Sequence, residues 1–260
     1  MPLPLSTARA ARLEFLEECG STNTELMIRA ADAWPDFSVV ATASQTAGRG
    51  RLDRVWVAPP GQALAVSVLL RPSFSLEGYG WLPLIAGLAM ARAVGRQLPA
   101  DVRVSIKWPN DVQVNGLKVS GLLAELLPTA DGVVVGAGLN LTIPADGLPT
   151  PNSTSLMLQG APVDDALLDR VLAAYLDELR QLYTGFAEHD GNAEASGIRH
   201  LVQQQCSTVG EQVRVELPGG QTRFGRASGI DELGRLSYTD GADGSVQAVA
   251  AGDVTHLRYE

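Results

Sequence analysis

Short runs of apolar residues along the first part of the chain have the alternation typical of strands. Strands are expected at Leu13–Glu17, at SVVATAS, at Ala63–Leu70 and at VRVSIKW. A helix is expected to begin within GSTNTELMIRAAD, where Thr22 and Glu25 have the spacing of a capping box. A second helix is expected over Trp81–Leu98. The pattern therefore places the polar Ser21–Asn23 cluster at the positive N-terminal end of the first helix.

Alternating apolar residues flank Asn115-Gly116 in the segment VQVNGLKV, which is a strong signal for a two-residue β-hairpin turn. In such a hairpin Gln113 faces Lys118. The alternation of side chains then puts Asp111 and Lys118 on the same face as diagonal neighbours. Further strands are expected at Gly121–Leu127 and Val133–Leu141.

The C-terminal half changes character at about Ser207. Before it, APVDDALLDRVLAAYLDELRQLY has helical spacing, and a weaker helix extends to about Gln205. After it, five short alternating segments predict a small β-barrel: VRVEL, RFGRASGI, GRLSYT, SVQAVA and VTHLRY. The predicted fold is α+β, a mixed sheet backed by helices, with one domain over residues 1–205 and a second over 206–260.

The formal charge of −9 and the pI near 4.9 argue against non-specific binding to nucleic acid or to an anionic membrane. The chain has no apolar run long enough to cross a bilayer and no basic-then-apolar leader, so a cytoplasmic location is expected. Cys19 and Cys206 lie far apart without metal-ligand spacing, so we expect two small buried hydrophobic residues.

Three polar clusters lie where predicted strands meet loops: Ser21–Asn23, Gln45–Trp56 and Lys107–Lys118. The middle cluster contains AGRGRLDR, which gathers three arginines around glycines in an otherwise acidic protein. Glycines let backbone amides approach a ligand closely, and guanidinium groups bind phosphate or carboxylate with paired donors. Taken alone, this loop is equally well explained as a solvated turn, because it matches no complete phosphate-binding motif.

Lys107 and Lys118 are the only lysines in the chain, which otherwise uses arginine for positive charge. A pair of Lys118 with Asp111 at the surface would contribute only ~0–1 kcal/mol. A lysine, however, is a compact charge on a flexible stem and can reach one oxygen atom in a small site where a planar guanidinium does not fit. Codon preference explains the missing lysines but not the two that remain, so we favour a functional role for both.

Four segments together resemble the biotin protein ligases: GSTN, SQTAGRGR followed by Trp56, KWPNDVQVNGLKVSGLL and VVVGAGLN. They cover most of Leu13–Leu141, and the C-terminal barrel is similar to the SH3-like domain of that family. The resemblance implies a class II synthetase-like catalytic fold. It also implies that the chain joins biotin to ATP, giving biotinyl-5′-adenylate and pyrophosphate, with Mg²⁺ as the accompanying metal ion. The biotinyl group would then pass to a lysine on the biotin carboxyl carrier domain of a biotin-dependent carboxylase.

The resemblance further implies roles for individual residues. Catalysis would involve Lys118, Arg49, Arg51, Lys107 and Asp111, and Asp111 would steer Mg²⁺ or the incoming amine. Biotin would be held by Ser21, Thr22, Asn23, Gln45, Arg49, Gly50, Arg51, Lys118, Gly121, Gly136 and Gly138. ATP and the adenylate would be held by Arg49, Arg51, Arg54, Trp56, Lys107, Asn110 and Asn140.

The sequence also departs from that family. Leu52-Asp53 stands where many relatives have a second glycine after the GRGR run. Many members carry an N-terminal helix-turn-helix repressor domain, whereas here the catalytic motifs begin almost at once, so we expect a monofunctional ligase without DNA binding. The alternatives are a lipoate protein ligase, whose substrate lacks the ureido ring that suits this polar pocket, and a non-catalytic effector that binds biotinyl-adenylate. A monomer and a homodimer are both compatible with the sequence.

Overall fold

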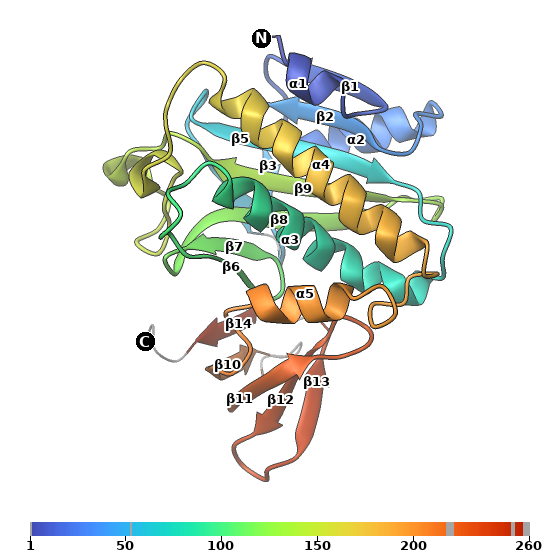
Figure 1. Ribbon diagram of the computed structural model, residues 1–260, viewed down its shortest axis with the longest axis vertical. Coiled ribbons are helices and arrows are strands. Elements are labelled where there is room, and N and C mark those ends of the chain that lie inside the picture. The colour runs from blue at the N-terminus through green and yellow to red at the C-terminus, as the bar shows by residue number, and fades with distance from the viewer. Residues whose placement is uncertain (1, 53, 217–220, 251–252, 257–260) are drawn as a thin grey trace.

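The computed structural model describes residues 2–52, 54–216, 221–250 and 253–256, with a large mixed sheet at its centre (Figure 1). Seven strands follow the order β1-β2-β5-β9-β8-β7-β6, in which β1 is parallel to β2 and each later neighbour is antiparallel. In that order the strands are β1 (Arg12–Leu16), β2 (Ser38–Thr42), β5 (Ala63–Leu70), β9 (Val133–Asn140), β8 (Leu117–Leu126), β7 (Asp111–Val114) and β6 (Val104–Lys107).

Helices cover both faces of this sheet. α3 (Leu82–Gly95) and α4 (Leu167–Ala187) lie together across one face (Figure 1). α2 (Thr22–Ala31) packs against β2, β5 and β9 on the other face. The remaining helical segments are α1 (Pro4–Thr7), α5 (Ile198–Gln205) and the 3₁₀ turns Leu76–Trp81, Ala145–Gly147 and Met157–Gln159.

The two faces of the sheet differ because side chains alternate along each strand. On β5, Val66 and Val68 belong to the main apolar core beneath α3 and α4. Between them Ser67 faces the α2 side and is fully buried there. One end of the α2 side is closed by a smaller apolar cluster that includes Leu26 and Trp34. Polar side chains such as Ser67 and Thr22 lie further along the same face.

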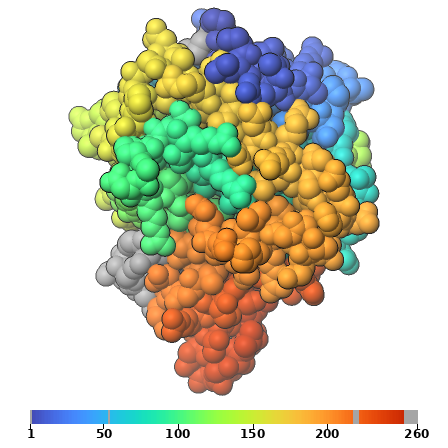
Figure 2. Space-filling view, viewed as in Figure 1, coloured from blue at the N-terminus to red at the C-terminus, as the bar shows by residue number. Residues whose placement is uncertain are grey.

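The C-terminal part forms a separate antiparallel sheet with the strand order β13-β12-β11-β10-β14. Its strands are β10 (Gln212–Glu216), β11 (Thr222–Ile230), β12 (Leu236–Asp240), β13 (Val246–Val249) and β14 (Asp253–His256). It projects as a narrower body from one end of the molecule (Figure 2). Its buried side chains nevertheless continue the main core. Two indoles tie the sheets together, because Trp81 Nε1 donates to Glu232 O at 2.8 Å and Trp108 Nε1 donates to Gly234 O at 3.1 Å.

The predicted α+β fold with a small SH3-like C-terminal unit is confirmed, as is the burial of both cysteines. Differences are local. The strand predicted at Gly121–Leu127 is part of one long strand that already begins at Leu117. The predicted helices over residues 81–98 and 161–183 run instead over Leu82–Gly95 and Leu167–Ala187. The strands predicted at VRVEL and VTHLRY extend at their C-terminal ends into residues outside the described ranges.

The predicted capping box at the start of α2 is wrong. Ser21 is the N-cap residue and makes no side-chain capping hydrogen bond. Thr22 instead turns its hydroxyl toward Gln45 and Ser67, and Glu25 pairs with Arg29 one turn along the helix. The polar cluster still lies at the N-terminal end of the helix, as predicted. Within the described residues, no helix combines the length and the apolar character needed to span a bilayer.

Candidate functional site

The α2 face of the large sheet contains a cavity of about 500 Å³. It is bounded by the N-terminal end of α2, by strands β8 and β9, and by a two-stranded hairpin of β3 (Gly48–Arg49) and β4 (Val55–Trp56). All three polar clusters predicted from the sequence meet there. The predicted residues that line it are Ser21, Thr22, Asn23, Gln45, Arg49, Gly50, Arg51, Arg54, Trp56, Lys107, Asn110, Asp111, Lys118, Gly121, Gly136 and Gly138.

The end of the cavity beside α2 is a closed hydrogen-bond network. Thr22 donates to Gln45 Oε1 from its backbone nitrogen at 2.9 Å and from its hydroxyl at 3.3 Å. Ser67, which the sequence analysis missed, places its hydroxyl 2.8 Å from Thr22 Oγ1 and 2.6 Å from Asn23 Oδ1. These groups are held rigidly by one another and by the strands beneath, so they can present fixed donors and acceptors to a ligand.

Glu125 on β8 is a second residue that the sequence analysis missed. Its Oε2 atom accepts a hydrogen bond from Asn23 Nδ2 at 2.6 Å and another from Arg49 Nη2 at 2.8 Å. Leu123 O, on the same strand, accepts from Asn23 Nδ2 at 3.2 Å. A carboxylate on a strand thus connects the start of α2 with the arginine hairpin, segments that are distant in the sequence.

The opposite end of the cavity is built on the predicted β7–β8 hairpin. Asn115 and Gly116 both have positive φ, 51° and 83°, as a two-residue turn of this kind requires. Gln113 lies opposite Lys118 as predicted, and a β-bulge then shifts the register so that Asp111 lies opposite Gly121. Lys118 Nζ and Asp111 Oδ1 are 2.6 Å apart, so the predicted neighbours form an ion pair.

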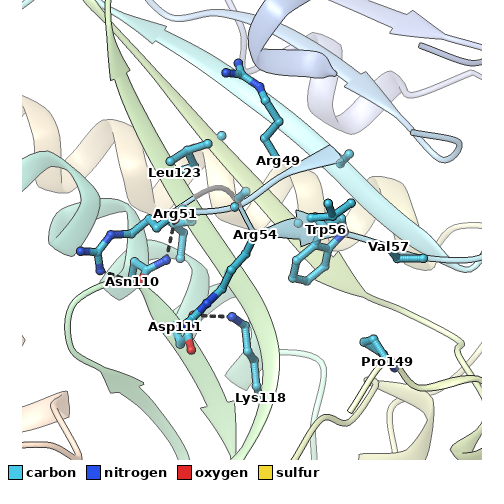
Figure 3. A pocket seen from close by; sticks show the side chains of 18 of the residues that line it. Arg49, Arg51, Arg54, Trp56, Val57, Asn110, Asp111, Lys118, Leu123 and Pro149 are labelled. Carbon is cyan, nitrogen blue, oxygen red and sulfur yellow. Dashed lines mark hydrogen bonds and ion pairs between the residues drawn. The ribbon is translucent and has the colours of Figure 1, made fainter. Parts of the chain in front are cut away.

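The arginine-rich loop is not an unstructured turn, because its two ends pair as β3 and β4. Gly50 N donates to Arg54 O at 2.7 Å, and Arg51 Nη1 donates to Asn110 Oδ1 at 3.2 Å. Figure 3 shows Arg51 and Arg54 directed toward the Asn110–Asp111 side of the cavity, whereas Arg49 points the other way. Leu52 at the tip has a φ of 55° and remains 63% exposed, and Asp53 lies outside the described residues.

Two glycines on β9 make room for the protein's own side chains. A Cβ atom on Gly136 would lie 2.2 Å from Asn23 Oδ1, and one on Gly138 would lie 2.4 Å from Trp56 Cε2. The resemblance implied that both glycines belong to the biotin site. The structure shows that the groups approaching them are the Asn23 amide and the Trp56 indole.

Asn140 is the predicted site residue that does not line the cavity. Its side chain is 2% exposed and donates from Nδ2 to Thr154 O at 2.9 Å. It thereby anchors a segment whose residues 149, 150, 152 and 153 do line the cavity, and which the sequence analysis treated only as a link. Lys118 holds the same segment through its backbone, because Lys118 N donates to Asn152 O and Thr154 N donates to Lys118 O, both at 2.8 Å.

The charge of the cavity is opposite to that of the whole protein. Its described lining residues include five cations, Arg49, Arg51, Arg54, Lys107 and Lys118, and a single carboxylate, Asp111. A net positive, partly enclosed site in a protein of formal charge −9 favours an anionic ligand such as a nucleotide or a carboxylic acid.

Comparisons with known proteins agree with this picture. Residues 18–140 match the Biotin/lipoate A/B protein ligase family, and residues 208–257 match the Biotin protein ligase C terminal domain. The chain is 37% identical over 252 residues to the biotin–acetyl-CoA-carboxylase ligase of Mycobacterium tuberculosis, covering 95% of this chain and 90% of that protein. It is 31% identical to the bifunctional ligase/repressor BirA of Bacillus subtilis, of which the aligned part covers 61%.

A solved structure gives the same result. The biotin protein ligase from Aquifex aeolicus in complex with biotin and ATP superposes with a TM-score of 0.73 at 26% identity. The superposition covers 94% of this chain and 98% of that chain.

Proposed function

The chain belongs to the biotin protein ligase family, and from that membership we propose the reaction that its cavity performs. The protein activates biotin with ATP to biotinyl-5′-adenylate and then transfers the biotinyl group to a lysine of an acceptor protein. The observation that carries the proposal is the meeting of three polar clusters around one cavity of about 500 Å³. This volume is within the range of sites that enclose small molecules.

Biotin is assigned to the end of the cavity beside α2. The network of Thr22, Asn23, Gln45 and Ser67 offers fixed donors and acceptors that suit the carbonyl and N–H groups of a ureido ring. Leu123 and other apolar side chains of the lining would contact the hydrocarbon part of the substrate. The carboxylate of biotin would then extend toward the cationic end of the cavity.

In the first step, a carboxylate oxygen of biotin attacks the α-phosphorus of ATP, and the bond from that phosphorus to the bridging oxygen breaks to release pyrophosphate. Negative charge builds on the phosphate oxygens, and donors fixed in advance stabilise it. Lys118, Lys107 and Arg51 are the side chains that we assign to this task. Trp56 and Arg54 are assigned to the nucleotide side.

In the second step, the acceptor lysine attacks the carbonyl carbon of the mixed anhydride, an amide bond forms and AMP leaves. The acceptor ammonium group must lose one proton before its nitrogen can attack and a second proton as the amide forms, and we assign to Asp111, the partner of Lys118, the task of steering this amine. Water must be kept from the anhydride meanwhile, and we assign this task to the β3–β4 hairpin, whose arginines line the cavity.

Mg²⁺ is expected to accompany ATP. Among the residues that the structure describes, no group of three or more His, Cys, Asp or Glu side chains could hold a metal ion. Mg²⁺ that accompanies a nucleotide is usually bound by substrate phosphates and water with one or two protein carboxylates. Asp111 would supply such a carboxylate, and the ion would neutralise phosphate charge.

The acceptor is expected to be the biotin carboxyl carrier domain of a biotin-dependent carboxylase. We propose that residues 1–205 form the catalytic domain and residues 206–260 a C-terminal domain. Neither nucleic acid nor a membrane is needed for any step of the reaction.

Exchange of labelled pyrophosphate into ATP tests the proposal, because adenylation is reversible. Exchange should occur with biotin and not in its absence. Exchange with lipoate but not with biotin would identify a lipoate ligase instead. No exchange with either acid would favour a non-catalytic protein that binds the adenylate.

A further inference from the structure

Glu125 is a carboxylate next to the cavity with no role in the steps above. The alternation along β8 places it on the same face as Leu123, which lines the cavity, and its side chain is 22% exposed. We propose that Glu125 is a positioning residue. It fixes the amide of Asn23 so that the amide oxygen serves the ligand, and it holds Arg49 at the rim until an anionic ligand replaces it. This inference rests on the proposed function, because it concerns the same two substrates.

The first part follows from the chemistry of donors and acceptors. An ionised carboxylate accepts hydrogen bonds and cannot donate them, as is true of a backbone carbonyl. Both acceptors, Glu125 Oε2 and Leu123 O, contact the same atom, Asn23 Nδ2. The two N–H groups of the amide are therefore committed to the protein, and its oxygen must point the other way.

The orientation of Asn23 decides what it offers to a substrate. Its Oδ1 lies 2.6 Å from Ser67 Oγ and against Gly136, which lines the cavity. An amide oxygen has two lone pairs, so one remains for an N–H donor such as that of a ureido ring. A reversed amide would present N–H groups there and repel the same donor. The carboxylate thus selects an acceptor at this position.

The second part concerns the arginine hairpin. Arg49 Nη2 donates to Glu125 Oε2 at 2.8 Å, and this is the same oxygen that accepts from Asn23. The Arg49 side chain is 46% exposed, and it points away from Lys118 and Asp111 (Figure 3). A half-exposed ion pair of this kind contributes little to the stability of the fold. A phosphate or carboxylate of the substrates can therefore take Arg49 away, while Asn23 stays bound to Glu125.

These two roles predict different effects on the two substrates. We expect Glu125→Gln to raise the KM for biotin in pyrophosphate exchange about tenfold, because a hydrogen bond to a charged group is lost and a glutamine side chain can accept either orientation of Asn23. The KM for ATP should stay equal or fall, since Arg49 is released from its carboxylate. Glu14→Gln is the matched control. Glu14 on β1 pairs with Arg29, which lies on α2 like Asn23, and neither residue of this pair lines the cavity.

A reciprocal change tests the orientation directly. Asn23→Asp alone places two carboxylates against each other and should abolish detectable biotin binding in calorimetry. Adding Glu125→Gln supplies an amide that donates to the new carboxylate, keeps an acceptor toward the cavity, and should restore binding to within about tenfold of Glu125→Gln alone. The inference is overturned if the double variant binds no better than Asn23→Asp, or if Glu125→Gln raises both KM values or neither. Absence of exchange by the unaltered protein would refute the proposed function instead.

Discussion

Lys118 Nζ lies 2.6 Å from Asp111 Oδ1, across a hairpin whose bulge brings the two strands into this register. The pair is partly open to solvent, with the lysine side chain 36% exposed, so it adds little to the stability of the fold. Both residues line the cavity, so the pair matters for the position of charge in the site. A lysine held by a carboxylate keeps its charge in one position before the substrates arrive.

Lys118→Arg should slow adenylation of biotin by about 10²–10³ in single-turnover assays, because it keeps the charge but changes its reach, and a displaced transition-state donor costs about this factor. The melting temperature should change little. Arg103→Lys, at an exposed position just before β6, is the control and should react at the normal rate. Normal rates for both Lys118→Arg and Lys107→Arg would assign the phosphate contacts to the hairpin arginines.

The β3–β4 hairpin should be cut by trypsin after Arg49, Arg51 or Arg54 in the unliganded protein and protected by biotin plus ATP. Its strands are two residues long, so opening it breaks few hydrogen bonds. Anionic ligands should add charge-assisted partners to its arginines. Mass spectrometry of the fragments identifies the sites, and cutting elsewhere in the chain provides the control. Equal cutting with and without ligands would show that the hairpin does not close over the site.

Gly138→Ala should weaken ATP binding by about 1–3 kcal/mol, equivalent to a rise of roughly 5- to 150-fold in the KM for ATP, because the new methyl group would overlap the indole of Trp56 and force it to move. Tryptophan fluorescence should change as well, because the environment of the Trp56 indole changes. The other indoles, at positions 34, 81 and 108, are buried and should contribute a constant signal. Gly185→Ala is the matched control. It adds a methyl group in α4 that meets no atom within 4 Å apart from the backbone of its own helix and its chain neighbours, so it should stabilise the protein by about 0.4–1 kcal/mol and leave the KM for ATP unchanged.

Cys19 should resist alkylation by iodoacetamide at pH 8 even though it lies beside the polar end of the cavity. Burial raises the pKa of its thiol to about 11. The reactive thiolate is the deprotonated form, so at pH 8 only roughly one molecule in a thousand carries it, and reactivity should increase as the pH approaches 11. Peptide mapping after alkylation measures this, with urea-unfolded protein as the reference. Rapid modification of the native protein at pH 8 would show that this region opens.

The parts of the fold that local sequence determines were predicted well. The β7–β8 hairpin is an example, because Asn115-Gly116 provides the positive φ angles of its turn and the alternation beyond it sets the pairing. The capping box at Thr22 failed for a physical reason. Its hydroxyl has better partners in Gln45 and Ser67, which become neighbours only after the sheet has formed. Tertiary contacts thus overrode a local preference.

The same reason explains the site residues that were missed. Glu125 follows a strand pattern with no polar motif around it, and it meets Asn23 and Arg49 only through the pairing of distant segments. Ser67 is a single polar position within an apolar strand. The segment at residues 149–153 has the composition of an ordinary link, and its place at the cavity depends on backbone bonds to Lys118. No short-range signal identifies any of these.

The hydrogen bonds from Trp81 and Trp108 to the loop at Glu232–Gly234 connect the C-terminal sheet with residues close to the cavity. Trp108 follows Lys107 directly and lies two residues before Asn110, and both of those residues line the cavity. Its indole and its backbone nitrogen are each anchored to residues beyond 205, the latter to Thr208 Oγ1 at 3.0 Å. Residues beyond 205 therefore support the Lys107–Asn110 segment, and removing them should loosen this part of the cavity lining.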